Sequence, residues 1–438
     1  MNAHRQIPTG RDRSGDGIAA DSSGPLMVVD LEADLLRKSQ KSEAFWASLS
    51  KRSGSGPGAV RLDPAALAYD PAVLERIASW RADGGRCALY AECDEAAGLA
   101  IALHLGLFDM VLATGGDRHK GAARAAWIAE AAGPDNLTTF AGKPARTGIS
   151  PWIKAMRPHQ WLKNALVFVP LVAAHRLEPA AILAACLAFA AFSTIASGVY
   201  VLNDLLDLAP DRAHPRKRNR PFASGAVPLV HGGWMAAALL AAGCGIAALI
   251  GPAFLAAMAA YFVLTTAYSL HLKRVMVIDI CILGLLYTLR VVAGGLATSV
   301  PLSVWLLAFC LFFFFSLAAV KRQAELVDNA ARQQLSPSGR GYHVDDLPII
   351  SMMAIGAGYV SVLVMALYVN SPDVLQLYPR PAFLWGICCL LLFWITRTVM
   401  LAHRGQMHDD PVVYAARDLT SLACGAAVLA CVVLGTFP

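Results

Sequence analysis

Four oxygen-bearing side chains precede a run of cationic side chains in residues 203–221, directly after a long apolar segment. The oxygen donors are Asn203, Asp204, Asp207 and Asp211, and the cations are Arg212, Arg216, Lys217, Arg218 and Arg220. Carboxylate and amide oxygens suit a hard cation such as Mg²⁺, which keeps some of its water and binds through substrate phosphates. Lys and Arg neutralise the phosphate charge that remains. The segment therefore predicts a magnesium-bridged diphosphate site at a membrane surface.

The arrangement of these acids depends on where the preceding helix ends. In a continuous helix, Asn203, Asp207 and Asp211 share one face, because a step of four residues returns to nearly the same direction. Pro210 interrupts this pattern, since proline lacks a backbone donor and disfavours helix in the residue before it. We therefore expect Asp211 to lie past the end of the helix, where it can turn toward a shared ion.

The composition assigns most of the chain to a lipid bilayer. Of the 438 residues, 56% are hydrophobic and only 16% are charged, which exceeds the apolar content of ordinary soluble proteins. Nine apolar stretches follow residue 160, each close to the ~20 residues that cross the hydrocarbon core. They are residues 161–177, 179–202, 228–250, 252–271, 276–298, 301–320, 347–370, 381–402 and 415–436. The first is short and contains Lys163 and Asn164, so its start is expected at the membrane interface.

Cationic residues in the connections predict the orientation of these spans. Connections after even-numbered spans carry twelve Lys and Arg residues, from Arg212 to Arg404, and those after odd-numbered spans carry only Arg176 and Arg380. The even-numbered connections and the N-terminus are therefore expected in the cytoplasm, with the protein in the cytoplasmic (inner) membrane. The cationic residues of these loops account for much of the net charge of +6. Because this charge is explained by membrane topology and by attraction to anionic lipid, no nucleic-acid partner is expected.

The first 150 residues have no apolar run of membrane-spanning length and no secretory signal pattern. Buried-strand patterns at 25–30, 87–90 and 110–113 alternate with helical patterns, which predicts a small cytoplasmic α/β domain with a parallel sheet. The predicted organisation is a disordered N-terminus at 1–24, an α/β domain at 25–148 and an all-α transmembrane domain at 149–438.

The front domain resembles the haloacid dehalogenase superfamily. The resemblance covers roughly residues 25–145, through the phrases Val29–Leu35, His104–Asp109 and Asp117–Gly121. Asp30 and Lys120 match the aspartate nucleophile and the lysine of that family. Glu32, Ala91 and Lys143 stand where a second aspartate, a hydroxyl residue and the first of two late acids are expected. The resemblance therefore implies a degenerate domain without phosphatase activity, whose role is structural or regulatory.

The transmembrane part resembles the UbiA superfamily of membrane prenyltransferases. This resemblance rests on Arg157–Asn164, on the 203–221 segment, on Tyr268–Arg274 and on Asp279. Within the superfamily, Arg157–Asn164, His214–Pro221 and Lys321–Leu326 are similar to the polyprenyl-phosphate phosphoribosyltransferase branch, of which the decaprenyl-phosphate enzymes are members. The resemblance implies a UbiA-like bundle of nine transmembrane helices that acts as a Mg²⁺-dependent transferase.

The charges of a second polar motif, after the sixth span, favour this branch. Ordinary aromatic prenyltransferases hold one lipid diphosphate through two aspartate-rich motifs, whereas here Lys321 and Arg322 precede Glu325 and Asp328. Phosphoribosyl pyrophosphate carries a 5-phosphate besides its diphosphate, and polyprenyl phosphate adds a third anionic group, so this reaction needs more cations. The candidates are Lys163, Lys217, Arg220, Lys273, Lys321 and Arg322.

Each polar motif has a role implied by the resemblance. Magnesium is expected on Asn203, Asp204, Asp207 and Asp211, with help from Glu325. Catalytic roles are expected for Asp204, Asp207, Asp211, Lys273 and Asp279. Substrate contacts are expected from Lys163, Asn164, Lys217, Arg220, Tyr268, Arg290, Lys321 and Arg322. Departure of diphosphate from ribose C1 would build oxocarbenium character, and attack by the anionic lipid phosphate would invert the anomeric centre.

Several of these residue types have a second interpretation. Asp279 and Arg290 lie within one predicted span, eleven residues apart on one face. Intramembrane charges mark function unless they form a structural pair or lie nearer the membrane interface than predicted. Lys and Arg at helix ends equally follow the positive-inside rule; this applies to Arg216, Arg218, Arg274, Arg332 and Arg340. The aromatic run Phe309–Phe315 lines a lipid groove or faces the bilayer, and the bilayer is favoured.

Two other functions fit parts of the pattern. One is a prenyltransferase that moves a polyprenyl chain from its diphosphate to an aromatic or other small acceptor. The other is a carrier whose acids coordinate an ion during transport, which is disfavoured because the acids gather at one surface and not at the membrane midplane. The partners expected are phosphoribosyl pyrophosphate, polyprenyl phosphate and the bilayer.

Overall fold

The computed structural model describes most of the chain. It covers residues 25–36, 46, 64–67, 69–92, 95–114, 126, 128, 137–139, 149–213, 217–333, 340–407 and 410–436. The chain divides into two compact units, the first made of residues 1–156 and 200–236 and the second of residues 157–199 and 237–438. The predicted disordered N-terminus at 1–24, and Lys120 and Lys143 of the front domain, lie outside the described residues.

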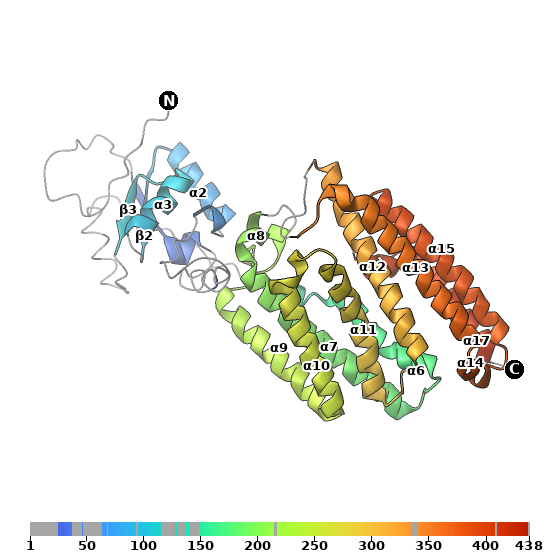
Figure 1. The fold of residues 1–438 in the computed structure, drawn as a ribbon. Helices are drawn as coiled ribbons and strands as arrows, with labels where there is room; N and C mark the ends of the chain where they lie inside the picture. Colours follow the sequence, from blue (N-terminus) through green and yellow to red (C-terminus); the bar gives the residue numbers. More distant parts are fainter. Residues whose placement is uncertain are drawn as a thin grey trace. The chain divides into compact units, whose positions relative to one another are not determined.

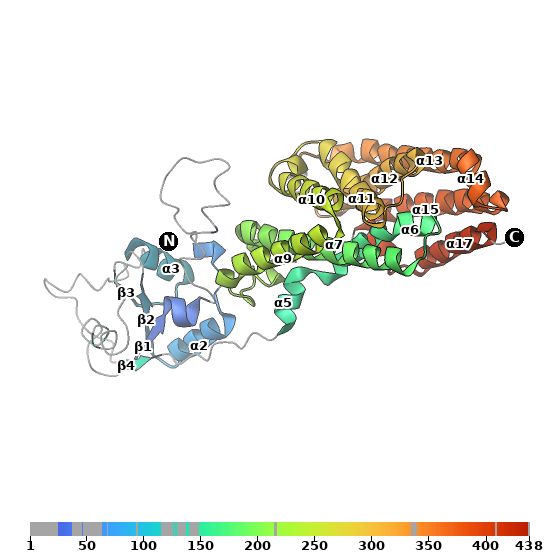
Figure 2. The same ribbon diagram turned by 90° about the horizontal axis from the view of Figure 1, so that it is seen from below.

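The first unit contains a small parallel sheet with the strand order β3–β2–β1–β4 (Figure 1, Figure 2). The strands are β1 (Leu26–Asp30), β2 (Arg86–Ala91), β3 (Met110–Ala113) and β4 (Leu137–Thr139), with the helices α2 (Pro71–Ala82), α3 (Glu95–Leu105) and α5 (Ile149–Met156). Side chains alternate between the faces of the sheet. Val29 therefore packs with Ile77 of α2 and Ile101 of α3, and Val28 packs with Tyr90 on the other face.

The three strands predicted from the sequence are confirmed, and they pair in parallel as expected. The fourth strand, β4, was not predicted, because its three residues are too few to produce an alternating pattern. Asp30 stands at the carboxyl end of β1, where the resemblance to the haloacid dehalogenase superfamily requires it. That resemblance stays a prediction.

Long apolar helices make up most of the remaining chain. They are α7 (Pro179–Leu206), α9 (Leu229–Ile250), α10 (Pro252–Leu270), α11 (Ile278–Thr298), α12 (Val304–Ala331), α13 (Leu347–Val369), α15 (Trp385–His403) and α17 (Leu419–Thr436). Each of these eight is long and apolar enough to cross a membrane, so this is a multi-pass membrane protein. In the second unit, α12 lies between α11 and α13 (Figure 1, Figure 2), with close approaches at Gly284 of α11 and Gly358 of α13.

The first predicted span, 161–177, is not a continuous helix. It consists of the 3₁₀ turns η4 (Pro158–Phe168) and the short helix α6 (Val169–Ala173), so the count of nine spans is not confirmed among the described residues. Proline lacks a backbone donor, and Pro170 stands at the start of α6. Lys163 and Asn164 are buried against polar partners. The segment therefore carries polar side chains into the interior of the second unit.

The turns of η4 lie directly against α11 at Gly294. A Cβ atom at this position would overlap the backbone of Val167. Gly294→Ala is therefore expected to destabilise the protein by about 1–3 kcal/mol, measured as a lower thermal unfolding midpoint in detergent. Gly425→Ala in α17 is the matched control, because a Cβ atom there meets open space. Equal midpoints for the two variants would contradict this packing.

Candidate active site

The acidic residues of the 203–221 segment lie at the end of α7 and in the short helix α8 (Leu208–Ala213). Asp207 N donates to Asn203 O and Asp211 N donates to Asp207 O, both at 2.9 Å. Asp211 lies past the end of α7, as expected, and belongs to the separate short helix α8. Pro210 is the third residue of α8, and proline is tolerated in the first turn of a helix, where its missing donor is not needed.

Arg220 holds two of these carboxylates together. Its NH1 lies 3.1 Å from Asp204 Oδ1 and 2.6 Å from Asp211 Oδ2, and both aspartates are buried. The described residues contain no ready group of three or more Asp, Glu, His or Cys side chains that could hold an ion. Even so, Asn203, Asp207 and the two convergent carboxylates are oxygen donors of the type that Mg²⁺ prefers. The residues therefore fit a magnesium ion by donor type.

In the second unit, a buried ion network surrounds Asp279 at the start of α11. Asp279 lies 2.9 Å from Arg322 NH2 and 3.1 Å from Arg340 NH1, and it accepts a 2.8 Å hydrogen bond from Tyr342 OH. Glu325 pairs with Arg322 and lies 3.0 Å from Arg340 Nε. Burial opposes the charge of Arg340, but Glu325, Tyr268 and Asp279 together outweigh burial and raise the pKa of Arg340. We call Asp279, Arg322, Glu325 and Arg340 the Asp279 network; its formal charges are balanced.

Also in the second unit, Asp410 is bound by two lysines. Its Oδ2 lies 2.8 Å from Lys163 Nζ and 3.1 Å from Lys321 Nζ. Its Oδ1 accepts hydrogen bonds of 2.7 Å from Tyr287 OH and 3.2 Å from Val412 N, at the start of the short helix α16 (Pro411–Ala415). Burial by itself would raise the pKa of Asp410, but the ammonium groups of Lys321 and Lys163 outweigh burial and hold it well below its usual value.

Arg290, in the middle of α11, is buried beside the Tyr287 ring, which Lys163 also approaches. Its guanidinium donates to Asn164 Oδ1 at 2.9 Å, to Tyr261 OH at 3.1 Å and to the carbonyl of Leu286. The Tyr287 ring lies 5.7 Å from Arg290 and 5.8 Å from the ammonium of Lys163. No carboxylate of the described residues forms an ion pair with Arg290. We call Lys163, Tyr287, Arg290, Lys321 and Asp410 the Asp410 cluster; it holds three cations and one carboxylate.

The structure assigns the sequence-predicted site residues to these groups. The Asp410 cluster includes Lys163, Arg290 and Lys321, and Asn164 contacts it. The Asp279 network includes Asp279, Arg322 and Glu325, and Tyr268 contacts it through Arg340. Asp279 and Arg290 do not pair with each other. Lys217 and Lys273 lie in the short 3₁₀ turns Lys217–Asn219 and Leu272–Arg274, and their roles stay predictions.

Two residues of these groups, Asp410 and Tyr287, are not identified from the sequence. Asp410 has a signal in the sequence, because an acid directly before Pro411 in the connection between the last two apolar stretches is typical of a helix start. Arg340 was left between topology and function. The guanidinium of Arg340 contacts Tyr268, Asp279 and Glu325. These contacts indicate that Arg340 has a structural or functional role beyond the positive-inside rule.

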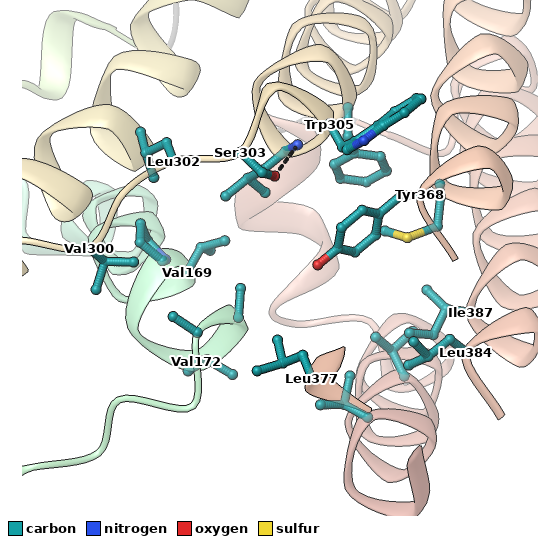
Figure 3. Close-up of a pocket in the computed structure, with 18 of the residues that line it drawn as sticks. Val169, Val172, Val300, Leu302, Ser303, Trp305, Tyr368, Leu377, Leu384 and Ile387 are labelled. Carbon is teal, nitrogen blue, oxygen red and sulfur yellow. Dashed lines mark hydrogen bonds between the residues drawn. The ribbon is translucent and has the colours of Figure 1, made fainter. Parts of the chain in front are cut away.

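An apolar cavity of about 620 Å³ lies in the second unit. Its walls come from α6, α12, α13, α15 and α17, and Figure 3 shows Val169 on one side with Ile387 on the other. Phe309 also lines it, and Phe314 is 4% exposed. The expectation that residues 309–315 face the bilayer is therefore wrong for these two. The volume is within the range of small-molecule and lipid pockets.

In the first unit, the carboxylate of Asp30 caps a helical turn and accepts hydrogen bonds of 2.8 Å from the backbone of Glu32 and of Ala33. Ala91, at the end of β2, brings no hydroxyl to this edge of the sheet. Asp30→Asn is therefore expected to leave transfer activity unchanged, and the full-length protein should not hydrolyse phosphate monoesters such as p-nitrophenyl phosphate. Magnesium-dependent hydrolysis that Asp30→Asn removes would overturn this prediction.

A model of the UbiA prenyltransferase family matches residues 165–406, more than half of the chain. The chain belongs to the UbiA prenyltransferase family. Nodulation protein NoeC of Azorhizobium caulinodans is 40% identical to this UbiA protein over 276 residues, which are 62% of this chain and 89% of NoeC. Decaprenyl-phosphate phosphoribosyltransferase of Mycobacterium tuberculosis is 39% identical over 184 residues, which are 40% of this chain and 59% of the mycobacterial protein.

The UbiA fold is also found in a solved structure. A UbiA homolog from Archaeoglobus fulgidus, bound to GPP and Mg²⁺, matches 65% of this chain and 99% of its own, with a TM-score of 0.50 and 15% identity. At 15% identity, this match supports a shared fold and carries no information about activity or substrates. The UbiA-like transmembrane fold expected from the sequence is thereby confirmed.

Proposed function

We propose that this UbiA family member transfers the 5-phosphoribosyl group of phosphoribosyl pyrophosphate to a polyprenyl phosphate and releases diphosphate. The family match supports group transfer on an isoprenoid lipid. The similarity to the mycobacterial phosphoribosyltransferase, over 40% of the chain, supports phosphoribose as the group transferred. The asymmetry of Lys and Arg between the connections supports a cytoplasmic active site and N-terminal domain.

The surplus positive charge of the Asp410 cluster is the observation that carries this proposal. Lys163, Arg290 and Lys321 are matched by one carboxylate, Asp410. Buried charge is costly unless it is compensated, and a phosphate monoester carries about −1.5 to −2 charges at pH 7. A prenyl diphosphate held by Mg²⁺ at the 203–211 acids would not need this second cationic site. A reaction between two phosphorylated substrates does need it.

The acids of the first unit have a different task in this reaction. Asn203, Asp204, Asp207 and Asp211 would hold Mg²⁺, which neutralises the charge of a diphosphate leaving group. Arg220 orients two of these carboxylates and adds positive charge for the phosphates. The proposed help of Glu325 to the metal competes with its ion pairs to Arg322 and Arg340.

The buried cations of the second unit orient phosphate oxygens. A lipid phosphate oxygen is already anionic near neutral pH, so its attack on ribose C1 needs no general base. Cations that hold the reacting phosphate groups in place lower the entropic part of the barrier. Attack in line with the departing diphosphate inverts the anomeric centre, and the products are polyprenyl-phosphoribose 5-phosphate and diphosphate.

Product analysis of the purified protein tests the proposal. With Mg²⁺, decaprenyl phosphate and ribose-labelled phosphoribosyl pyrophosphate, mass spectrometry should detect decaprenyl-phosphoribose 5-phosphate and diphosphate. A parallel reaction replaces both substrates with decaprenyl diphosphate and a small aromatic acceptor. Product in the second reaction alone would make the protein a prenyltransferase of the rival kind. No covalent product in either reaction would favour a carrier.

A further inference from the structure

Lys321 and Arg322 are neighbours in α12, but they belong to different ion groups. Consecutive residues of an α-helix point about 100° apart. Lys321 Nζ lies 3.1 Å from Asp410, whereas Arg322 NH2 lies 2.9 Å from Asp279. The sequence motif alone suggests that both cations bind phosphoribosyl pyrophosphate. Their separation in the structure indicates two different tasks.

The two groups also differ in charge balance. In the Asp279 network, Arg322 and Arg340 are matched by Asp279 and Glu325. In the Asp410 cluster, Lys163 and Lys321 share one carboxylate and Arg290 is bound by the neutral Asn164 and Tyr261, a formal surplus of two positive charges. The formal charges of the network are therefore balanced, whereas the cluster has more cations than carboxylates, even though Glu325 of the network also attracts Lys321. This surplus favours the binding of an anion.

A chain of aromatic rings joins the Asp410 cluster to the apolar cavity. Tyr287, whose hydroxyl binds Asp410, stacks on Phe314 with a centroid distance of 5.3 Å. Phe314 contacts Phe313 at 5.5 Å, and Phe313 stacks on Phe309 at 5.1 Å. Phe309 is a wall of the cavity. The cationic cluster and the wall of the cavity thus belong to one packed apolar group of side chains within the second unit.

We propose that the Asp410 cluster binds the phosphate of the lipid acceptor, and that the cavity of Figure 3 takes part of its isoprenoid chain. This inference rests on the proposed function and adds which substrate the cluster serves. An isoprenoid phosphate joins one doubly charged group to an apolar chain, which is the combination that the cluster and the cavity offer. Phosphoribosyl pyrophosphate has no apolar part and gains nothing from the cavity.

Asp410 is a positioning residue in this arrangement. A single oxygen holds the ammonium groups of Lys163 and Lys321 at 2.8 and 3.1 Å, and the other oxygen holds the Tyr287 hydroxyl at 2.7 Å. The cations are therefore oriented before the lipid phosphate binds, which reduces the entropy lost on binding.

Direct binding measurements on the purified full-length protein test the assignment. Lys321→Gln is expected to weaken the binding of decaprenyl phosphate in detergent micelles by about 10- to 100-fold, the value of a charged hydrogen bond. Binding of phosphoribosyl pyrophosphate with Mg²⁺, and of decaprenol, which lacks the phosphate, should be unchanged. Arg332→Gln, at the C-terminal end of the same helix, is the matched control, because Arg332 forms an exposed pair with Asp328. Lys163→Gln repeats the test if Lys321→Gln does not fold.

The cavity is tested by filling it. Val169→Trp should weaken the binding of decaprenyl phosphate and leave the binding of geranyl phosphate unchanged, because the short chain does not need the cavity. The inference would be overturned if Val169→Trp weakened the binding of both lipids equally. It would also be overturned if Lys321→Gln and Lys163→Gln weakened the binding of phosphoribosyl pyrophosphate as much as the binding of decaprenyl phosphate. A wild-type protein that binds decaprenyl phosphate but not phosphoribosyl pyrophosphate would instead overturn the proposed function.

Discussion

Asp207→Asn is expected to abolish turnover while the protein stays folded. Asp207 is half-buried at the junction of α7 and α8, and the substitution removes a charge without changing the size of the side chain. Even the loss of an outer-shell partner of a metal ligand costs about 10–100-fold, so the loss of a proposed ligand should exceed about 100-fold. The measurements are initial rates at saturating Mg²⁺ and substrates, together with the thermal unfolding midpoint.

Asp328→Asn is the control for this variant. Asp328 pairs with Arg332 at the end of α12, where the side chains are 43% and 38% exposed, and an exposed pair of this kind contributes little. Its turnover should stay close to that of the wild-type protein. Near-normal turnover of Asp207→Asn, or full activity in excess chelator, would contradict the assignment of a magnesium-bound diphosphate.

The acidic segment could be predicted from the sequence because its donors are local. Four of them fall within nine positions, so chain connectivity alone brings them near one another. The structure agrees, since Asp204 and Asp211 converge on Arg220. The three longer strands and eight of the spans could also be predicted, because the apolar pattern of each is complete within one short stretch of chain.

The Asp410 cluster could not be predicted, because its members are far apart in the sequence. Asp410 is 247 residues from Lys163 and 89 residues from Lys321, and no spacing relates them. Their contact depends on how η4, α12 and α16 pack. The orientation of residues 309–315 could not be predicted for a related reason: this segment is an unbroken apolar run, with Cys310 and Leu311 among its phenylalanines, and it has no polar position to indicate which face of the helix is buried.

The broken first span has a different cause. Apolar content predicts that a stretch is buried in lipid or protein, but it does not record which backbone donors are missing or which polar side chains find partners. Asn164 donates to Ser193 Oγ at 3.1 Å and accepts from Arg290 at 2.9 Å. These contacts stabilise a non-helical segment where a hydropathy pattern alone predicts a helix.

Asp279→Asn is expected to act on folding more than on chemistry. Asp279 is fully buried, and Arg322, its ion-pair partner, is 0% exposed. Neutralising the carboxylate leaves a buried guanidinium with Glu325 as its remaining ion-pair partner, and breaking a buried pair costs about 3–5 kcal/mol. The folded yield and the thermal unfolding midpoint in detergent should therefore fall. Molecules that do fold should keep most of their turnover.

Two further variants separate the structural role of Asp279 from the catalytic role that the sequence predicted. Tyr342→Phe removes one hydrogen bond to Asp279 and should cost only about 1 kcal/mol. Asp279→Leu combined with Arg322→Met replaces the pair with apolar side chains, which is often neutral or stabilising, and should recover part of the stability that Asp279→Asn loses. An Asp279→Asn protein with a wild-type midpoint and no turnover would contradict the structural role. The carboxylate would then act on a substrate even though three protein side chains already bind it.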